Sequence, residues 1–270
     1  MAGTMGSIGP VIHSGLESHG LHVERMEFPQ NVFRDEFGYW RHLLKAISEH
    51  SPEMILPVGN PLALSRIRDR LPSGITIPIE TEEKLRTLDG KVSCSRLASD
   101  LGILQPRMYP SPDEVGERQV VFKRDISFGG HGVHLPWTKR SLLNLIAHQP
   151  EGEPYLIEDY IEGCDYSVDA LRWDGFFRAG SYRCLQNQGN GPSTSRESVD
   201  FPELEAISRK ILDHLDYHGV CGMDFRVAED GQIYFLECNP RFTGGIKTQI
   251  ASGFDIPYLY WQLAKDGQRS

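Results

Sequence analysis

The stretch at residues 234–245, Tyr-Phe-Leu-Glu-Cys-Asn-Pro-Arg-Phe-Thr-Gly-Gly, constrains this chain more than any other segment. An apolar strand runs into Glu237, Asn239 and Arg241, and alternate residues of an extended segment point to the same face. Carboxylate and amide oxygens suit Mg²⁺ as ligands, and a guanidinium suits phosphate or carboxylate. Taken alone, the segment also fits a strand end followed by a Pro/Gly turn with a chance salt bridge.

The composition bounds the kind of protein that this chain can form. Its 270 residues are 39% hydrophobic, which is enough to bury a sizeable core in one or two domains. A formal net charge of −9 argues against general binding to nucleic acid, because no basic surplus exists to displace counterions from phosphates. No apolar run reaches membrane-spanning length and no basic-then-apolar leader opens the chain. We therefore expect a cytoplasmic protein with neither a nucleic-acid nor a membrane partner.

Cysteine and histidine spacing predicts neither a disulfide framework nor a zinc cluster. The five cysteines are odd in number and scattered, and no CxxC pair occurs. His131 and His134 lie three apart in a Gly-rich stretch but lack companions at metal-ligand spacing, so we interpret them first as loop residues.

Residues 1–79 have the pattern of a small α/β unit. The spacing of apolar residues predicts helices over 11–20 and 37–50 and strands over 21–28 and 53–58. A strand normally precedes the first helix of such a unit, and almost no chain is left here to supply it. Either residues 1–4 are its remnant or the unit lacks one strand.

The rest of the chain mixes helical and strand patterns. Helical spacing over 80–100 is broken at Asp89-Gly90, and Thr138 is expected to cap a helix that runs to His148. Pro202 begins an amphipathic helix. Residues 185–199 are polar and are expected to form a mobile loop. Strands are expected over 120–123, 155–160, 166–173, 176–183, 220–227 and 232–236, the last two as a hairpin around 229–231.

A glycine-rich loop follows the strand that ends at Lys123. The glycines of Gly129-Gly130-His131-Gly132 let backbone amides approach phosphate oxygens, and Lys123 adds a compact positive charge. The segment has neither Walker A nor good Rossmann spacing. Alone, it fits a plain hairpin turn equally well.

A second apolar strand becomes acidic where it leaves the sheet, at residues 156–165. Backbone groups at such an edge can hydrogen-bond an adenine ring, and carboxylates can bind ribose hydroxyls. A solvated acidic turn is the alternative, and this segment by itself favours that alternative.

The third group consists of Asp224, Glu237 and Asn239. Antiparallel pairing across the predicted hairpin places Asp224 close to residues 236–238, so two carboxylates and an amide converge. Like charges packed there repel one another unless they are protonated or bridged by cations. Two Mg²⁺ ions holding a nucleoside triphosphate resolve this repulsion, and here the functional interpretation is the stronger one.

The order of these parts resembles the ATP-grasp superfamily over about residues 80–250. A lysine, a Gly-rich loop, an acidic hinge and then Asp…Glu-x-Asn follow one another along the chain. The tail Glu-Cys-Asn-Pro-Arg-Phe-Thr-Gly-Gly is similar to the carbamoyl-phosphate-synthase-like and amino-acid-ligase-like branches. The resemblance implies an α/β fold, with the two α+β lobes of ATP-grasp proteins preceded by a small Rossmann-like domain that is truncated or one strand short. The implied domains are 1–79 and 80–270, the latter divided into a small lobe at 80–156 and a large lobe at 157–270.

The resemblance also implies a role for each matching residue, with ATP lying between the lobes and Mg²⁺ (or Mn²⁺) as the metal. The nucleotide-binding residues would be Lys91, Lys123, Gly129, Gly130, His131, Gly132, Glu158, Asp159, Tyr160, Ile161, Asp165 and Leu236. The metal ligands would be Asp224, Glu237 and Asn239, and the catalytic cations Arg241, Lys123 and Arg183. The sequence departs from the family pattern at Asp165, which is shorter than the usual Glu, and at Phe128, which adds bulk to the loop.

The activity implied is ATP-dependent ligation of a small-molecule carboxylate to an amine or thiol through an acyl phosphate, which for an amine is C–N bond formation. A phosphotransferase on the same fold and a non-catalytic nucleotide-binding protein are the alternatives. Arg196, Arg241, Lys247 and residues 185–199 are expected to frame the acceptor pocket, and a homodimer is common for enzymes of this type.

Overall fold

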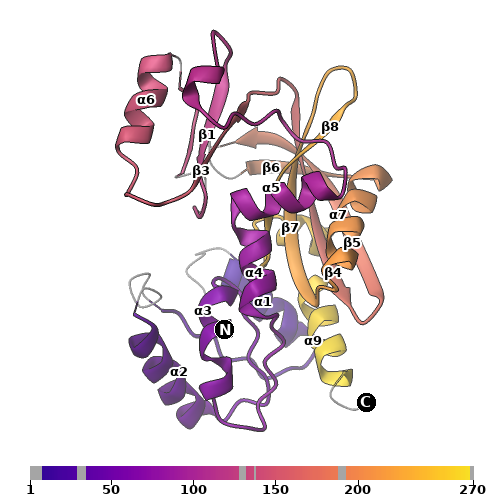
Figure 1. Cartoon of the computed structure of the whole chain (residues 1–270). Coiled ribbons are helices and arrows are strands. Elements are labelled where there is room, and N and C mark those ends of the chain that lie inside the picture. The colour runs from indigo at the N-terminus through magenta and orange to yellow at the C-terminus, as the bar shows by residue number, and fades with distance from the viewer. Residues whose placement is uncertain (1–7, 29–34, 128–131, 137, 188–192, 268–270) are drawn as a thin grey trace.

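The computed structural model describes residues 8–28, 35–127, 132–136, 138–187 and 193–267. Figure 1 shows helices of the N-terminal quarter at one end, a small sheet with one helix at the other end, and a larger sheet between them. The first and last described helices, Ile8–Ser18 and Ile256–Asp266, pack in the same hydrophobic cluster. The long sheet is the centre of the molecule, and most functional candidates lie on it or against it.

The N-terminal part consists of helices packed around extended segments. The helices are α1 (Ile8–Ser18), α2 (Glu36–His50) and α3 (Pro61–Ile67), followed by the 3-10 turn η2 (Arg68–Arg70). Leu43, Ile47, Leu64 and Ile67 form a core of their own with Ile55. Asn60 caps α3 by accepting a hydrogen bond from the Ala63 N–H.

The two strands predicted in this part do not form. Among the described residues before position 120, strand pairing is limited to isolated bridges such as the parallel bridge between Met54 and Thr76. Residues 21–28 and 53–58 form no strand ladder, although Phe28, Ile55, Leu56 and Val58 are buried in clusters with helical residues. An apolar pattern indicates that a segment is buried, but it does not show whether a neighbouring strand is there to pair with it. The pattern here therefore predicts buried side chains correctly and strand pairing wrongly. A Rossmann-like sheet is therefore not seen in the described part of this region.

Two consecutive helices lead to the central sheet. They are α4 (Glu82–Asp89) and α5 (Lys91–Asp100), and the break at Gly90 falls where the sequence predicts it. A Cβ at Gly90 would lie 3.0 Å from the Arg86 carbonyl oxygen and 2.6 Å from the Ser93 hydroxyl, so the tight corner favours glycine. Asp125 caps α5, because its carboxylate accepts from the Val92 N–H at 2.8 Å. Lys91 is thereby fixed at the first turn of α5.

The small sheet has the order β2-β1-β3 and is covered by one helix. Its strands are β1 (Val120–Arg124), β2 (Val133–His134) and β3 (Tyr155–Asp159), and the 3-10 turn η3 (Pro112–Glu114) precedes them. The covering helix α6 (Lys139–Ala147) starts at Thr138, which forms a capping box with Ser141 as the sequence predicts for the N-cap. Lys123 and Phe122 are buried in or beside this sheet.

The large sheet is antiparallel, with the order β6-β5-β4-β7-β8. Its strands are β4 (Cys164–Trp173), β5 (Phe176–Asn187), β6 (Ser193–Val199), β7 (Gly219–Val227) and β8 (Ile233–Asn239). The predicted loop over 185–199 is wrong at both ends, because its described residues extend β5 to Asn187 and form β6. Alternating polar residues such as Ser195 and Glu197 suit an edge strand, which has one solvated side.

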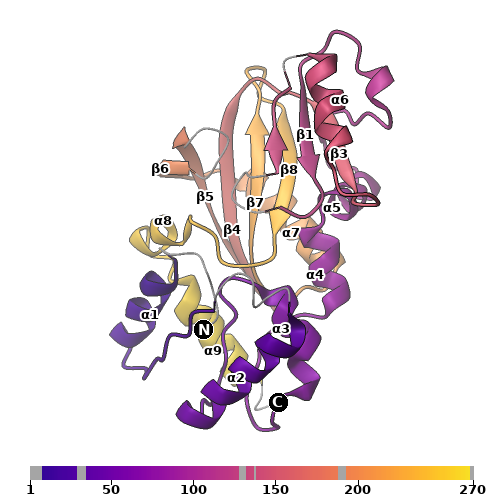
Figure 2. The same cartoon turned by 90° about the vertical axis from the view of Figure 1, so that its left-hand side faces the viewer.

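Helices cover the two faces of this sheet unequally. Figure 2 shows α4, α5 and α7 (Pro202–His214) on one side, and α1, α8 (Ile246–Ala251) and α9 (Ile256–Asp266) on the other. The first face carries the main core, in which Val168, Met223 and Phe225 pack against Leu212. On the second face, Leu171 and Val220 are packed against α1, α8 and α9 at one end of the strands. The other end of that face carries Ser167, Asp169 and Asp224.

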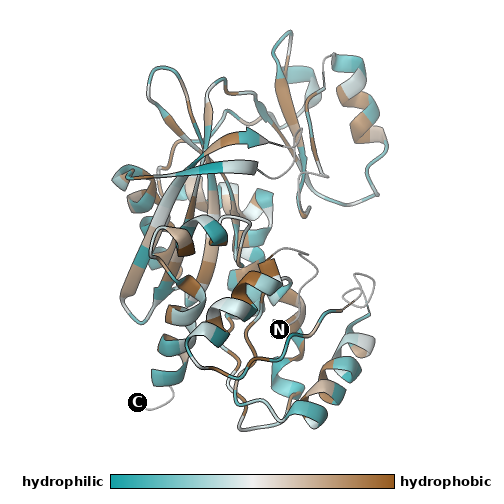
Figure 3. Cartoon of the chain, turned by 180° about the vertical axis from the view of Figure 1, so that it is seen from behind, coloured by the Kyte–Doolittle hydropathy of each residue, from teal (hydrophilic) through white to brown (hydrophobic). Residues whose placement is uncertain are grey.

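The hydropathy of the residues follows the separation between the buried sheet and the covering helices. Figure 3 shows hydrophobic residues along the central strands and hydrophilic residues on the outer turns of the helices. None of the helices in the described ranges is both long enough and apolar enough to span a bilayer.

Candidate active site

The β7–β8 hairpin brings the predicted metal-ligand residues together. Asp224 is the direct cross-strand partner of Glu237, which lies within the predicted range of 236–238, and a register shift between Asp224 and Phe225 sets this pair. The Nδ2 atom of Asn239 donates to Asp224 Oδ2 at 3.4 Å. The hydroxyl of Ser167, on the neighbouring β4, donates to Asp224 Oδ1 at 2.6 Å. Two carboxylates and one amide therefore meet at one place on the face that helices leave open.

Arg241 joins this group although it lies beyond the strand. Strand β8 ends at Asn239, and the Arg241 N–H donates back to the Asn239 carbonyl oxygen at 2.7 Å in the Pro240 turn. The guanidinium nevertheless returns to the site, where Nη2 donates to Asn239 Oδ1 at 2.7 Å. Arg241 is buried, so this charge lies in a region of low dielectric where it acts strongly on its neighbours.

Two lysines reach the same site from other elements. Lys91 Nζ, from α5, lies 3.3 Å from Glu237 Oε2. Lys123 Nζ, from β1, lies 2.6 Å from Glu158 Oε1 and donates to the Leu236 carbonyl oxygen at 3.5 Å. Both lysine side chains are buried. The small sheet, α5 and the hairpin thus each contribute charge to one cluster.

The environment separates the pKa values of the two carboxyl groups in the hairpin. Burial, reinforced by the Glu237 charge, raises the pKa of Asp224 to about 7. Burial also acts to raise the pKa of Glu237, but Lys91, Lys123 and Arg241 outweigh it and hold that pKa below its usual value. Burial acts to lower the pKa of Lys123, and the Glu158 and Glu237 carboxylates reverse the direction and raise it. Such divergent pKa values are typical of functional sites.

The donor atoms fit a hard divalent cation bound together with phosphate. Asp224, Glu237 and Asn239 offer only oxygen ligands, which Mg²⁺ and Mn²⁺ prefer over nitrogen and sulfur. Within the described ranges, no group of three or more His, Cys, Asp or Glu side chains could hold a metal ion by itself. Two carboxylates and one amide leave the remaining coordination positions to phosphate oxygens or water, as Mg²⁺ usually requires.

The residues predicted to form the hinge lie at the end of β3 and just beyond it, and Glu158 has a different environment from its neighbours. Its carboxylate is buried against Lys123. Asp159 accepts a hydrogen bond from the Tyr109 hydroxyl at 2.5 Å, and the Tyr160 N–H donates to the Gln119 carbonyl oxygen at 3.0 Å. The Ile161 carbonyl oxygen accepts from Arg226 Nη1 at 3.2 Å.

Asp165 lies beside this hinge, on the site face of β4. Its carboxylate lies 2.8 Å from Nε of Arg226, the cross-strand partner of Asp165 on β7. The Arg226 guanidinium also lies over the Tyr160 ring, 5.5 Å from its centroid. Arg226 therefore ties the hinge to the sheet that carries the hairpin.

The glycine loop is only partly described. Gly129, Gly130 and His131 lie outside the described residues, and so does Phe128. Gly132 is described, and its carbonyl oxygen accepts from the Arg124 N–H at 2.9 Å. A Cβ at Gly132 would lie 2.4 Å from the Ser127 Cβ, so the two ends of the loop approach each other closely. Lys123 is thereby adjacent to both ends of the loop.

Arg183 does not lie where its predicted role requires. It pairs with Tyr166, which pairs with Phe225, so these three side chains share the face that α7 covers. Ser167, Tyr182 and Asp224 share the opposite face. Arg183 Nη2 donates to Cys164 Sγ at 3.2 Å instead. Successive residues of a strand point to opposite faces of the sheet, so Arg183 and Tyr182 lie on different faces. The expectation that Arg183 faces the phosphates is therefore wrong for the observed register.

Replacing Arg183 therefore tests the register. Arg183→Ala is expected to keep nucleotide affinity within roughly twofold of the wild type, because substitutions away from a site usually change free energies by no more than about 0.5 kcal/mol. Lys91→Ala is the positive control and should lower nucleotide affinity, since Lys91 forms an ion pair with Glu237 in the site. Calorimetric titration with Mg-ATP compares the two, and equal losses for both would contradict this placement of Arg183.

The sequence analysis missed a buried polar group beneath the tail. Asp169, two residues beyond Ser167 on β4, accepts from the Thr243 hydroxyl at 2.6 Å. Gln249 Nε2 donates to the Gly180 carbonyl oxygen at 2.7 Å. A Cβ at Gly245 would lie 2.2 Å from Asp169 Oδ2, so Gly245 packs directly on this carboxyl group. The alternation of Asp165, Ser167 and Asp169 on one strand face was the signal that could have revealed the group.

The pH dependence of stability should report on Asp169. Burial raises the pKa of Asp169 from 3.8 to about 6, so the folded state retains a proton that the unfolded state releases. This carboxyl group therefore stabilises the fold fully below pH 3.8, and that contribution of about 3 kcal/mol is lost as pH rises to about 6. Asp169→Asn should remove this slope from denaturant unfolding measured at pH 4 to 7. The exposed control Asp230→Asn should keep the slope, and an unchanged slope in Asp169→Asn would contradict the assignment.

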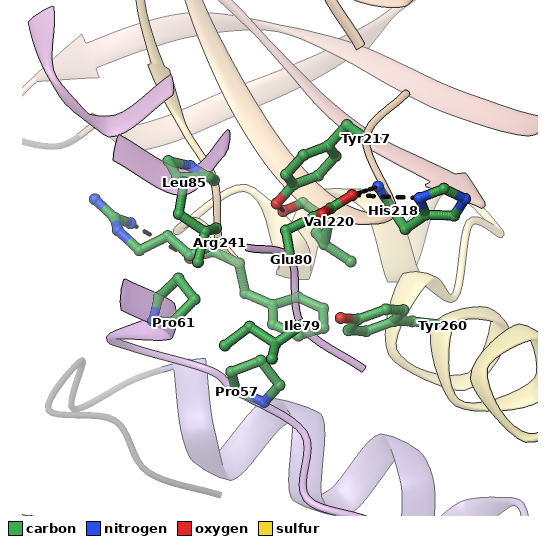
Figure 4. A pocket seen from close by; sticks show the side chains of 12 residues that line it. Pro57, Pro61, Ile79, Glu80, Leu85, Tyr217, His218, Val220, Arg241 and Tyr260 are labelled. Atoms are coloured by element: carbon green, nitrogen blue, oxygen red, sulfur yellow. Dashed lines mark hydrogen bonds and ion pairs between the residues drawn. The ribbon is translucent and has the colours of Figure 1, made fainter. Parts of the chain in front are cut away.

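A small cavity lies behind the Arg241 segment, with room for about one water molecule. Residues from distant parts of the chain line it, including Ile79, Glu80, Val220 and Phe242. Figure 4 shows Glu80 directed at His218, whose backbone N–H donates to Glu80 Oε1 at 2.6 Å. In the same view the Arg241 guanidinium extends away from Glu80. The cavity contains none of the three oxygen-ligand candidates, so we interpret it as a packing feature that supports Arg241 from behind.

A small sheet and a larger antiparallel sheet, each covered by helices, bring buried lysines and carboxylates together, and known proteins share this fold. Residues 151–270 match the model of a family described as "ATP-grasp in the biosynthetic pathway with Ter operon". The carbamoyl phosphate synthase large chain of Thermomicrobium roseum is 24% identical over 222 residues, which cover 74% of this chain and 20% of that protein. This chain spans about a fifth of the length of the curated relatives it matches.

Solved structures agree with this assignment. The biotin carboxylase domain of Hydrogenobacter thermophilus 2-oxoglutarate carboxylase superposes with a TM-score of 0.75 at 17% identity, covering 96% of this chain and 67% of that one. An L-amino acid ligase from Bacillus licheniformis superposes with a TM-score of 0.73 at 15% identity, covering 97% of this chain and 72% of that one. The family model over residues 151–270 and the shared fold confirm the resemblance to the ATP-grasp superfamily that the motifs predict.

Proposed function

We propose that this protein is an ATP-dependent ligase that joins a small-molecule carboxylate to an amine or thiol, with an acyl phosphate as intermediate and ADP and phosphate as products. The observation that carries the proposal is the Asp224–Glu237 pair, with Asn239 beside it and Lys91 and Lys123 against it. The relatives' names support the reaction class, since they include a carbamoyl phosphate synthase and an amino acid ligase. For an amine acceptor, the bond formed is a C–N bond.

In this proposal the nucleotide lies between the small sheet and the β7–β8 hairpin. Lys91 and Lys123 bind its phosphates, the backbone at Asp159–Ile161 binds adenine, and Asp165 binds ribose. Gly129, Gly130, His131 and Gly132 close over the phosphates. Asp224, Glu237 and Asn239 hold Mg²⁺ or Mn²⁺, which neutralises charge on the phosphate oxygens when bound. The structure with MgADP, ADP and bicarbonate is that of the Hydrogenobacter carboxylase domain, and it supports this use of the fold.

The proposed reaction has two steps in one cleft. A substrate carboxylate oxygen attacks the γ-phosphorus in line, the bond to the β-phosphate oxygen breaks, and ADP leaves. The amine then attacks the acyl carbon, phosphate leaves with the bonding electrons, and the amine proton passes to solvent or phosphate. The lysines and Arg241 hold the transferring group and stabilise its charge, so catalysis is positioning plus electrostatics.

The acceptor is proposed to bind beside Arg241, next to the Gly244-Gly245 turn. The Arg196 guanidinium lies over the Tyr182 ring, 5.6 Å from its centroid, and a Cβ at Gly244 would lie 2.9 Å from Arg196 Nη2. Arg196 and Lys247 then frame the acceptor with Arg241. We further propose that residues 1–79 form a unit separate from 80–270, with 80–156 and 157–270 as the two lobes, and that the enzyme is a cytoplasmic homodimer.

A substrate screen that reads ADP release tests the function. Purified protein is incubated with Mg-ATP and a panel of carboxylic acids, with and without amines and thiols. ADP and free phosphate in equal amounts, formed only when acid and acceptor are both present, are the expected result. A stable phosphorylated product would indicate a phosphotransferase instead, and Mg-ATP binding without turnover across the panel would indicate a non-catalytic nucleotide-binding protein.

A further inference from the structure

Internal donors already contact each of the three candidate metal ligands. Lys91 Nζ lies 3.3 Å from Glu237 Oε2, and the Ser167 hydroxyl donates to Asp224 Oδ1 at 2.6 Å. Arg241 Nη2 donates to Asn239 Oδ1 at 2.7 Å. The cation that contacts Glu237 in this structure is therefore a lysine of the protein itself. A metal ion entering this site must compete with it.

The charges of the cluster are also close to balanced. Lys91, Lys123 and Arg241 supply three positive charges. Glu158, Glu237 and Asp224 supply three carboxyl groups, and Asp89 lies near enough to act on Lys91 and Arg241. A divalent cation alone would add two charges to a mostly buried and nearly neutral cluster, and a nucleotide alone would add several negative ones. Uncompensated charge in such surroundings costs several kcal/mol per ion.

We propose that Lys91 is an internal substitute for the metal on Glu237, and that it makes binding of the divalent cation depend on nucleotide. This inference rests on the proposed function, because it assigns the ligand set and the phosphate-binding lysines as given there. When a nucleotide enters, its phosphates offer Lys91 a partner other than Glu237. Glu237 is then available to the cation that accompanies the phosphates. The cation and the nucleotide therefore bind as a unit rather than independently.

The geometry lets Lys91 move from Glu237 to the phosphates by a change of its side chain alone. Lys91 is the first residue of α5, where Asp125 holds the backbone, so only its side chain has to move. The Lys91 side chain is 5% exposed and that of Glu237 is 26% exposed, so solvent screens this pair less than it screens a surface ion pair. Lys123 pairs with Glu158 at 2.6 Å and therefore does not replace Lys91 on Glu237. By thermodynamic linkage, the factor by which nucleotide increases metal affinity equals the factor by which metal increases nucleotide affinity.

Metal binding measured without turnover tests the proposal. Mn²⁺ is titrated into the wild type and Lys91→Met by electron paramagnetic resonance of the free ion, with and without a non-hydrolysable ATP analogue. The analogue is expected to tighten Mn²⁺ binding to the wild type by about 10-fold or more. Lys91→Met is expected to tighten Mn²⁺ binding without nucleotide by about 10-fold or more and to weaken binding of the analogue. The two opposite shifts in one variant are the signature of a competing lysine.

The control is Lys139→Met, which removes the same charge from a surface pair with Asp113 and should leave both affinities unchanged. Thermal unfolding confirms that each variant is folded. If Lys91→Met binds free Mn²⁺ no better than the wild type, the inference is wrong while the proposed function stands. If the wild type binds neither the analogue with Mg²⁺ nor Mn²⁺ with the analogue, the proposed function itself fails.

Discussion

Asp224→Asn and Glu237→Gln are each expected to lower ATP turnover by at least about 100-fold while the protein remains folded. Both substitutions preserve side-chain size and remove one negative charge from the cross-strand pair that is proposed to hold the metal. The Ser167 hydroxyl can still donate to the oxygen of an asparagine at position 224, so local packing is retained. The measurement is ADP release at saturating Mg-ATP, with the acid and acceptor found in the substrate screen.

Glu229→Gln and Asp230→Asn are matched controls, because they remove the same charge at the turn of the same hairpin, away from the site. Both should turn over ATP at the wild-type rate. Circular dichroism melts show whether any variant has lost its fold. Full activity in Asp224→Asn and in Glu237→Gln would defeat the metal assignment.

Lys123→Met is expected to lower the free energy of unfolding by about 3–5 kcal/mol and to abolish nucleotide binding. Lys123 and Glu158 are both buried and lie 2.6 Å apart, so removing one partner leaves a buried charge uncompensated. Lys139→Met, from an exposed pair, should cost no more than about 1 kcal/mol. Denaturant unfolding measures both changes.

The double variant Lys123→Met/Glu158→Gln separates the two roles of Lys123. Removing both charges restores most of the stability, because neither is then buried without a partner. Nucleotide affinity is not expected to return, since the proposed phosphate contact is still missing. Recovery of nucleotide binding together with stability would show that Lys123 has only a structural role.

Local sequence patterns predicted the hairpin because its geometry is short-range. The turn at 229–231 places Asp224 close to residues 236–238, so its convergence with Glu237 could be anticipated. The exact pair depends on a register shift between Asp224 and Phe225 that the turn does not predict. The break between α4 and α5 and the cap at Thr138 depend equally on a few adjacent residues. These features required no knowledge of the rest of the fold.

Features that depend on distant pairing were missed. Glu158 lies two residues beyond Leu156, the direct partner of Lys123 on β3, so their ion pair is a diagonal contact that only the register reveals. The face of Arg183 depends on the register of β5 against β4, which the sequence does not state. In the N-terminal part, buried extended segments and paired strands have the same apolar pattern, and the pattern therefore predicted strands that do not form.

A crystal structure with Mn²⁺ and a non-hydrolysable ATP analogue tests the central claim most directly, because anomalous scattering locates the metal without reference to the protein. We expect a manganese peak within coordination distance of the Asp224 and Glu237 carboxylates and the Asn239 amide oxygen, with the analogue's phosphates between that peak and Lys123. Manganese and nucleotide bound elsewhere on the chain, with the Lys91–Glu237 pair intact, would contradict it.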